Sequence, residues 1–128
     1  METIMEAIGI EVIEVTKDRV VATMPVHGPT KQPVGLLHGG ASVVLAETVA
    51  SVGSMHLVDQ ESEAAVGLEI NANHIRSMRE GSVKAIGTPL HLGRTTHIWE
   101  IKISDERTGK LVCISRCTIA VIKKNKAE

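Results

Sequence analysis

Apolar and polar residues alternate along much of this 128-residue chain, with the two-residue period that is typical of half-buried β-strands. The last of these segments is especially rich in β-branched residues, which favour strands. Pro89 interrupts another segment, so we expect that strand to be bent or to lie at the edge of its sheet. The predicted strands are residues 10–16, 19–26, 66–75, 83–92, 95–104 and 111–122.

One long stretch departs from this alternation. Residues 39–58 are apolar almost throughout, which indicates a long helix that is buried around most of its circumference. A short helix is expected at residues 2–8, and Pro and Gly residues mark 27–37 as a loop. One long helix with two strands before it and four after it predicts an α+β fold. An antiparallel sheet would wrap a single central helix in one domain spanning residues 1–128.

Glu47 stands in the middle of the apolar stretch, where it is the only acidic or basic residue apart from His56. None of its neighbours at helical spacing carries a positive charge that could neutralise it. A carboxylate in such surroundings is costly to ionise, so we expect its pKa to be raised and treat it as a candidate for the functional site. The alternative is an ordinary Glu on a solvated helix face.

Composition excludes several classes of function. The formal net charge is −1, so the chain lacks the excess positive charge that would attract nucleic acid or an anionic membrane surface. The apolar stretch is a poor membrane span because Glu47 lies at its centre, and the acidic N-terminus is unlike a secretory signal. Cys113 and Cys117 are spaced too widely along one strand to form a disulfide, which favours a reducing, cytoplasmic location. The six His residues are scattered, so no metal site is expected.

The start of the long helix is where chemistry is expected. A helix N-terminus offers unpaired backbone N–H groups, and glycine lets a ligand approach them closely. Such a site can stabilise the oxyanion of an acyl-transfer reaction, with a carboxylate as base or nucleophile. A plain loop-to-helix junction remains the alternative, as does a packing role for the serine one turn after the carboxylate. The candidate catalytic residues are Gln32, His38, Gly39, Glu47 and Ser51, with Gly40 beside them for substrate binding.

Distance along the helix adds a prediction about assembly. Gly39 and Glu47 are eight residues apart, which is about 12 Å of helix. One Glu side chain cannot span that distance and still reach a carbonyl held by the Gly39 N–H group. If both residues act on one substrate, they come from two chains, and we expect a homodimer with composite sites.

Three segments, KQPVGLLHGGASVVLAET, VGLEINANHIRSMREG and PLHLG, closely resemble the hotdog-fold acyl-CoA thioesterases. The most similar branch contains the 1,4-dihydroxy-2-naphthoyl-CoA thioesterase of menaquinone synthesis and the proofreading thioesterase of enterobactin synthesis. The resemblance implies a hotdog fold, a Glu that acts across the dimer interface, and a tetramer built from two dimers. It assigns the site to Gln32, His38, Gly39 and Glu47, with Ser51 as the hydroxyl residue one turn later.

An acyl-CoA substrate carries phosphates, so a basic rim is expected around the site. His74 and Arg76 are the favoured candidates, because the family binds CoA near their segment. His91 and Asn73 are further candidates, although an asparagine in this strand can be purely structural. CoA would be part of the substrate, and no separate cofactor is expected.

The sequence therefore predicts an acyl-CoA thioesterase, with 1,4-dihydroxy-2-naphthoyl-CoA as the leading substrate. A broad-range proofreading thioesterase and a non-catalytic acyl-CoA-binding module are the alternatives. A hotdog dehydratase or hydratase is disfavoured by the segment around His38. The identity of the acyl group stays open, as does the choice between nucleophilic and general-base catalysis by Glu47.

Overall fold

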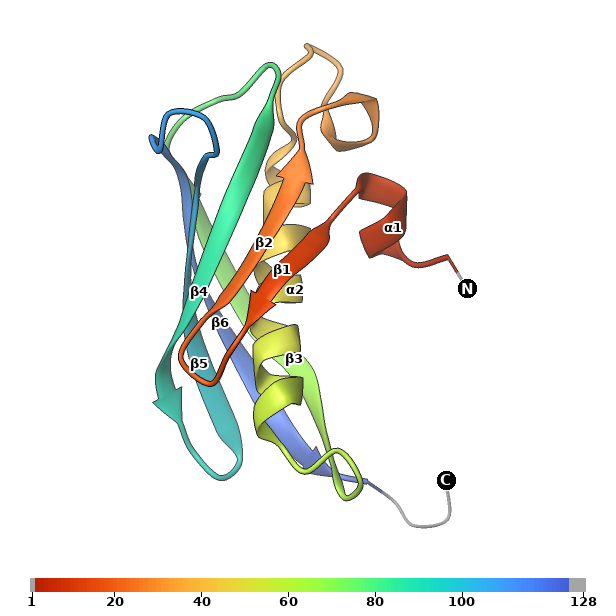
Figure 1. Cartoon of the computed structure of the whole chain (residues 1–128), viewed down its shortest axis with the longest axis vertical. Coiled ribbons are helices and arrows are strands. Elements are labelled where there is room, and N and C mark those ends of the chain that lie inside the picture. The colour runs from red at the N-terminus through yellow and green to blue at the C-terminus, as the bar shows by residue number, and fades with distance from the viewer. Residues whose placement is uncertain (1, 125–128) are drawn as a thin grey trace.

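The computed structural model describes residues 2–124, and its six strands form one antiparallel sheet that curls around the long helix α2 (Figure 1). The strand order is β1-β2-β4-β5-β6-β3. This confirms the predicted α+β fold. The elements are α1 (Ile4–Ile8), β1 (Glu11–Val15), β2 (Val20–Pro25), the 3-10 helix η1 (Gly28–Thr30), α2 (Gly39–Leu57), β3 (Glu63–His74), β4 (Ser82–Leu92), β5 (Thr96–Asp105) and β6 (Leu111–Lys123).

Helix α2 packs on the concave face of the sheet through small and aliphatic side chains. The single aromatic residue, Trp99, is fully buried against this helix, and a Cβ atom at Gly53 would collide with its indole ring. The rest of the core consists of aliphatic and methionine side chains and two buried thiols, Cys113 and Cys117, which are both free, as predicted. The buried residues of α2 are Ser42, Leu45, Ala46, Val49, Ala50, Gly53 and Ser54.

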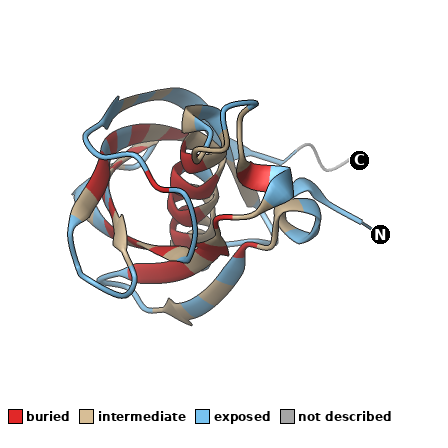
Figure 2. Cartoon of the chain, turned by 90° about the horizontal axis from the view of Figure 1, so that it is seen from above, coloured by how far each residue is buried: buried red, intermediate tan, exposed pale blue. Residues whose placement is uncertain are grey.

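The prediction that α2 is buried around most of its circumference is wrong for the single chain. The buried residues cover one side of the helix, whereas Val44, Ser51 and Met55 are only partly buried and Glu47 is exposed. Figure 2 shows the reason, because the strands surround the helix without closing into a complete ring. One side of α2 is therefore left for other contacts. Within residues 2–124, no helix is long and apolar enough to cross a membrane.

Strand β4 is bent rather than an edge strand. It lies between β2 and β5, and a bulge falls between Pro89 and His91. Its pairing with β2 ends at Gly87, so Pro89 lies beyond the part of the strand that has neighbours on both sides. The missing N–H group of the proline therefore costs the sheet little.

Residues 75–81 do not form a hairpin, because β3 and β4 are not neighbours in the sheet. This charged segment instead crosses the end of the molecule where α2 begins (Figure 1). Met78 anchors it there. Its side chain is buried, and its backbone carbonyl accepts a hydrogen bond of 2.8 Å from the Leu37 N–H group. The crossing brings the end of β3 close to the start of α2.

Candidate active site

His38 caps the N-terminus of α2. Its Nδ1 atom accepts a hydrogen bond of 2.8 Å from the Gly40 N–H group, and its carbonyl accepts bonds from the N–H groups of Ala41 and Ser42. A neutral ring that accepts at Nδ1 carries its proton on Nε2, which remains free to donate. Among residues 2–124, the Gly39 N–H group has no hydrogen-bond acceptor. The helix start therefore leaves one backbone donor available to a ligand.

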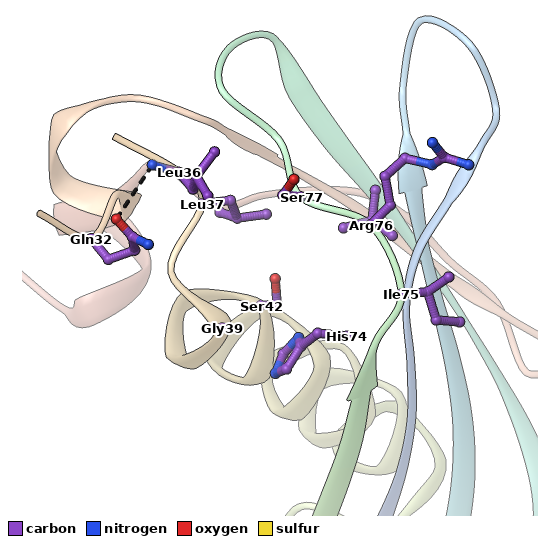
Figure 3. Close-up of a pocket in the computed structure, with 10 residues that line it drawn as sticks. Gln32, Leu36, Leu37, Gly39, Ser42, His74, Ile75, Arg76 and Ser77 are labelled. Carbon is purple, nitrogen blue, oxygen red and sulfur yellow. Dashed lines mark hydrogen bonds between the residues drawn. The ribbon is translucent and has the colours of Figure 1, made fainter. Parts of the chain in front are cut away.

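Gln32 is fixed in the loop before the helix by its own backbone neighbours. Its Oε1 atom accepts a hydrogen bond of 2.6 Å from the Val34 N–H group. It also accepts a longer one of 3.5 Å from the Leu36 N–H group, which Figure 3 shows. With the oxygen used in this way, the amide group of Gln32 is left as a donor. Gln32 and Gly39 thus both present hydrogen-bond donors near the start of α2.

A cavity of about 360 Å³ lies between this loop, the first turn of α2 and the end of β3. The His74 ring lies over the helix start, where a Cβ atom at Gly39 would approach its Nε2 atom to 2.8 Å. Glycine is therefore the residue that lets this ring and the helix N-terminus come together. Besides the backbone of Gly39, the cavity wall includes the polar residues Gln32, Ser42, His74, Arg76 and Ser77 (Figure 3).

Glu47 lies outside this cavity. Its side chain rests over Gly67 of β3, where an added Cβ atom would meet Oε2 at 2.7 Å. The prediction that Glu47 is buried among apolar residues is wrong for the single chain, in which the residue is exposed. The physical reason is that β3 is the last strand of the sheet, so no further strand covers this side of the helix.

Ser51 follows Glu47 by one turn of α2. It lines a separate, mainly apolar depression together with Val15, Val52 and Met55. Within the described chain, no hydrogen bond joins the Ser51 hydroxyl to Glu47. The two residues predicted to act as a pair are therefore neighbours on the helix without being bonded.

The remaining predicted residues do not all gather at the cavity. The Gly40 N–H group is already used by the His38 ring. Asn73 lines a different hollow, together with Asn71, Lys102 and Arg116. His91 lies near the turn between β4 and β5, at the opposite end of the molecule from the start of α2 (Figure 1). Of the predicted CoA-binding residues, the single chain brings His74 and Arg76 to the cavity and leaves Asn73 and His91 apart from it.

The structure contains two polar features that the sequence did not suggest. Ser42 lies in the cavity wall, although a single serine in an apolar helix forms no motif. Further along the helix, Ser54 is buried and bonded to the Nδ1 atom of His97 at 2.7 Å and to Trp99 Nε1 at 2.8 Å. Burial lowers the pKa of His97, as does the neighbouring His91, whereas Glu63 raises it.

The two free thiols belong to the core and not to the site. Burial raises the pKa of Cys113, and burial together with the carboxylates of Glu47 and Glu69 raises the pKa of Cys117 to about 12. A thiol is a nucleophile only as its thiolate, so these side chains are poor candidates for catalysis. Within residues 2–124, no three His, Cys, Asp or Glu side chains gather as metal ligands would.

The family model of the Thioesterase superfamily matches residues 34–112. A Bacillus subtilis protein named "Putative esterase ComA2" is 60% identical over 122 residues, which cover 95% of this chain and 96% of that protein. A Listeria monocytogenes protein named 1,4-dihydroxy-2-naphthoyl-CoA hydrolase is 51% identical over 123 residues, which cover 96% of this chain and 98% of that protein.

A comparison with solved structures indicates the same family. The crystal structure of a mutant thioesterase from Pseudomonas aeruginosa matches with a TM-score of 0.92 and 47% identity, over 95% of this chain and 87% of that one. Its sheet and helix correspond to the arrangement described above. This chain therefore belongs to the thioesterase superfamily, has the hotdog fold and is a thioester hydrolase.

Proposed function

We propose that this protein hydrolyses an aryl- or acyl-CoA thioester, and that 1,4-dihydroxy-2-naphthoyl-CoA of menaquinone synthesis is its substrate. The observation that carries the proposal is the free Gly39 N–H group at the start of α2, beside a cavity that Gln32 and His74 also line. Support for the acyl group comes from the Listeria relative, which is named as the hydrolase of that thioester.

In the proposed reaction, the thioester carbonyl accepts a hydrogen bond from the Gly39 N–H group at the positive end of the helix dipole. The amide of Gln32 and the Nε2–H group of His38 orient the thioester from the loop side. Overall, the oxygen of water is added to the acyl carbon and the carbon–sulfur bond breaks. The products are a carboxylic acid and the CoA thiolate, which takes up a proton to give the free thiol.

Glu47 of a neighbouring chain assists this reaction in one of two ways. It either removes a proton from the attacking water, or it adds to the carbonyl itself, so that the CoA thiolate leaves and water then hydrolyses the acyl–Glu47 anhydride. The hydroxyl of Ser51 would hold this carboxylate once the site is assembled. In the single chain, Glu47 projects from the exposed side of α2, which is where a residue serving another chain should lie.

The two edges of the sheet suggest where the second chain binds. β1 is five residues long, and a bulge between Val12 and Glu14 interrupts its pairing. β3 is 12 residues long and exposes Val66 and Leu68, with exposed fractions of 42% and 63%. A long edge strand with exposed apolar side chains is one that native proteins normally cover.

Antiparallel pairing of β3 with the β3 strand of a second copy would cover this edge. It would also turn the end of one strand, which carries His74, toward the half of the other strand that carries Gly67. Glu47 lies over Gly67. A dimer of this kind supports the composite site, and two such dimers would form the proposed tetramer.

His74 and Arg76 supply the proposed binding site for the CoA phosphates. Both line the cavity beside the helix start, and both are exposed, so a long substrate can reach them from solvent. Phosphate groups are bound well by arginine, which offers several donors in one plane. Asn73 and His91 could join this rim only through contacts made in the oligomer.

A hydrolysis screen tests the proposed function. Purified protein would be incubated with 1,4-dihydroxy-2-naphthoyl-CoA, benzoyl-CoA, palmitoyl-CoA and acetyl-CoA, and release of the free CoA thiol would be measured. We expect the highest kcat/KM for the naphthoyl thioester. Glu47→Gln, which removes the ionisable group at nearly constant shape, should lose about 10²–10⁴-fold in kcat.

Different outcomes distinguish the alternatives. Similar kcat/KM values for all aryl and fatty substrates would favour a broad proofreading thioesterase. Binding of acyl-CoA without any release of thiol would favour a binding module. Hydrolysis that persists unchanged in Glu47→Gln would show that Glu47 has no catalytic role.

A further inference from the structure

Ser42 is a buried polar residue whose hydroxyl group faces the cavity at the start of α2. Its side chain is among the most buried in the protein, with an exposed fraction of 1%. Figure 3 shows the hydroxyl pointing away from the helix and into the cavity that Gln32 and His74 also line. None of the hydrogen bonds among residues 2–124 involves this hydroxyl, although the Ser42 N–H group is bonded to the His38 carbonyl.

The hydroxyl lies at the cavity wall and keeps a small accessible area, so it is not sealed in the core. Among residues 2–124, no polar side-chain atom that is completely closed off lacks a hydrogen-bond partner. An unpartnered serine would gain nothing at this position, because alanine forms helices more readily and would fill nearly the same space. The Ser42 hydroxyl is therefore placed to bond to whatever group occupies the cavity.

The helix geometry directs Ser42 toward Gly39. Residues three apart on a helix lie on the same face, and side chains lean toward the helix N-terminus. The hydroxyl of Ser42 and the N–H group of Gly39 consequently approach the same part of the cavity from one turn of α2. The Gly39 N–H group also lacks an acceptor within the described chain.

We propose that the Ser42 hydroxyl is a second hydrogen-bond donor to the thioester carbonyl, acting beside the Gly39 N–H group. This inference rests on the proposed function, because it assigns a further residue to the same reaction. As the carbonyl carbon becomes tetrahedral, its oxygen gains negative charge, and both donors bond more strongly to it. The hydroxyl keeps its proton throughout, so Ser42 forms no covalent bond to the substrate.

Ser42→Ala tests this role by kinetics. We expect kcat to fall about 10²-fold while KM changes little, because the bond strengthens in the transition state. The matched control is Ser54→Ala, which removes another buried hydroxyl from the same helix. Ser54 is bonded to His97 and Trp99 and does not line the cavity, so its loss should lower Tm and leave kcat near the wild-type value.

Ser42→Cys serves as a second variant of similar size, in which a weak S–H donor replaces the hydroxyl. It should also have a reduced kcat, and circular dichroism would verify that both variants are folded. A kcat within twofold of wild type in either folded variant would overturn the proposed role. A loss confined to KM would overturn it as well, since it would place Ser42 against the CoA arm.

A binding measurement separates this inference from the proposed function. Benzoyl-CoA labelled with ¹³C at its carbonyl would be bound to Glu47→Gln protein, and its carbonyl stretching frequency measured by infrared spectroscopy. Binding should lower the frequency, and adding Ser42→Ala should partly reverse that shift. If the bound frequency is the same with and without Ser42→Ala, the role of Ser42 is overturned and the proposed function is not. A wild-type protein that neither binds nor hydrolyses any acyl-CoA overturns the proposed function, and this inference with it.

Discussion

At the level of single residues, the polar groups near the start of α2 fall into two sets. The chain uses the His38 ring nitrogen and the Gln32 oxygen for its own hydrogen bonds. It leaves the Gly39 N–H group and the Ser42 hydroxyl without partners among residues 2–124. The bonds of the first set hold the loop and the helix start in place. The free donors of the second set are therefore positioned before any substrate binds, which is what oxyanion stabilisation requires.

His97 belongs to a different part of the molecule and affects stability. Its Nδ1 atom is hydrogen-bonded to the Ser54 hydroxyl, whose oxygen also accepts a bond from the Trp99 indole. A neutral ring suits this buried arrangement. It is consistent with the lowered pKa of His97, which results first from burial and second from the neighbouring His91.

The lowered pKa predicts a specific loss of stability in acid. Below the ordinary value of 6.5, the unfolded chain takes up a proton at residue 97 that the folded chain does not. The contribution of His97 is thus complete above pH 6.5 and is lost as the pH falls toward the lower pKa of the folded state. We expect Tm to fall between pH 7 and pH 5 in the wild type, and to fall less steeply in His97→Asn. Equal slopes in the two proteins would contradict this role of His97.

At the level of elements, the six strands and the long helix could be predicted because their signals are local. Alternation marked each strand, and a continuous apolar run marked α2. The start of β3 at Glu63, three residues earlier than predicted, depends on pairing with Lys123, which no local pattern reveals. The path of residues 75–81 across the helix start depends on strand order, and so it too lies outside what periodicity can show.

The sequence predicted those residues of the candidate site that belong to a recognisable motif, and it missed those that do not. Gln32, His38 and Gly39 form a recognisable segment, and they do gather at the start of α2. Ser42 was missed because a lone serine in an apolar helix resembles a small packing residue. The exposure of Glu47 was missed because sequence periodicity shows which side of a helix is apolar, but not which side remains uncovered in one chain.

Gly39→Ala tests the first turn of α2 as an element. The added Cβ atom would lie 2.8 Å from His74 Nε2, and the exposed His74 side chain can move aside, so the fold should survive. We expect kcat/KM to fall about 10²-fold, because His74 is displaced and the N–H group is crowded. Gly28→Ala is the matched control, since nothing lies within 4 Å of a Cβ atom there. Equal activity in both variants would argue against a substrate contact at Gly39.

At the level of the whole molecule, the single chain keeps the two parts of the proposed site apart. One half is the cavity at the start of α2, and the other is Glu47, about 12 Å further along the same helix. The uncovered side of α2 and the unpaired edge of β3 lie next to Glu47. Pairing of two copies would cover both of these surfaces, and each copy would then contribute one half to each proposed site.

Mixed dimers test this shared site most directly. Glu47→Ala and His38→Ala are each expected to be inactive alone, since each removes one half of every site. Co-expression with two affinity tags would give random dimers, of which about half are mixed, and each mixed dimer has one intact site. Activity should therefore recover to about a quarter of the wild-type value in the random mixture, and to about half in purified mixed dimers. Purified mixed dimers no more active than their parents would contradict a site shared between two chains.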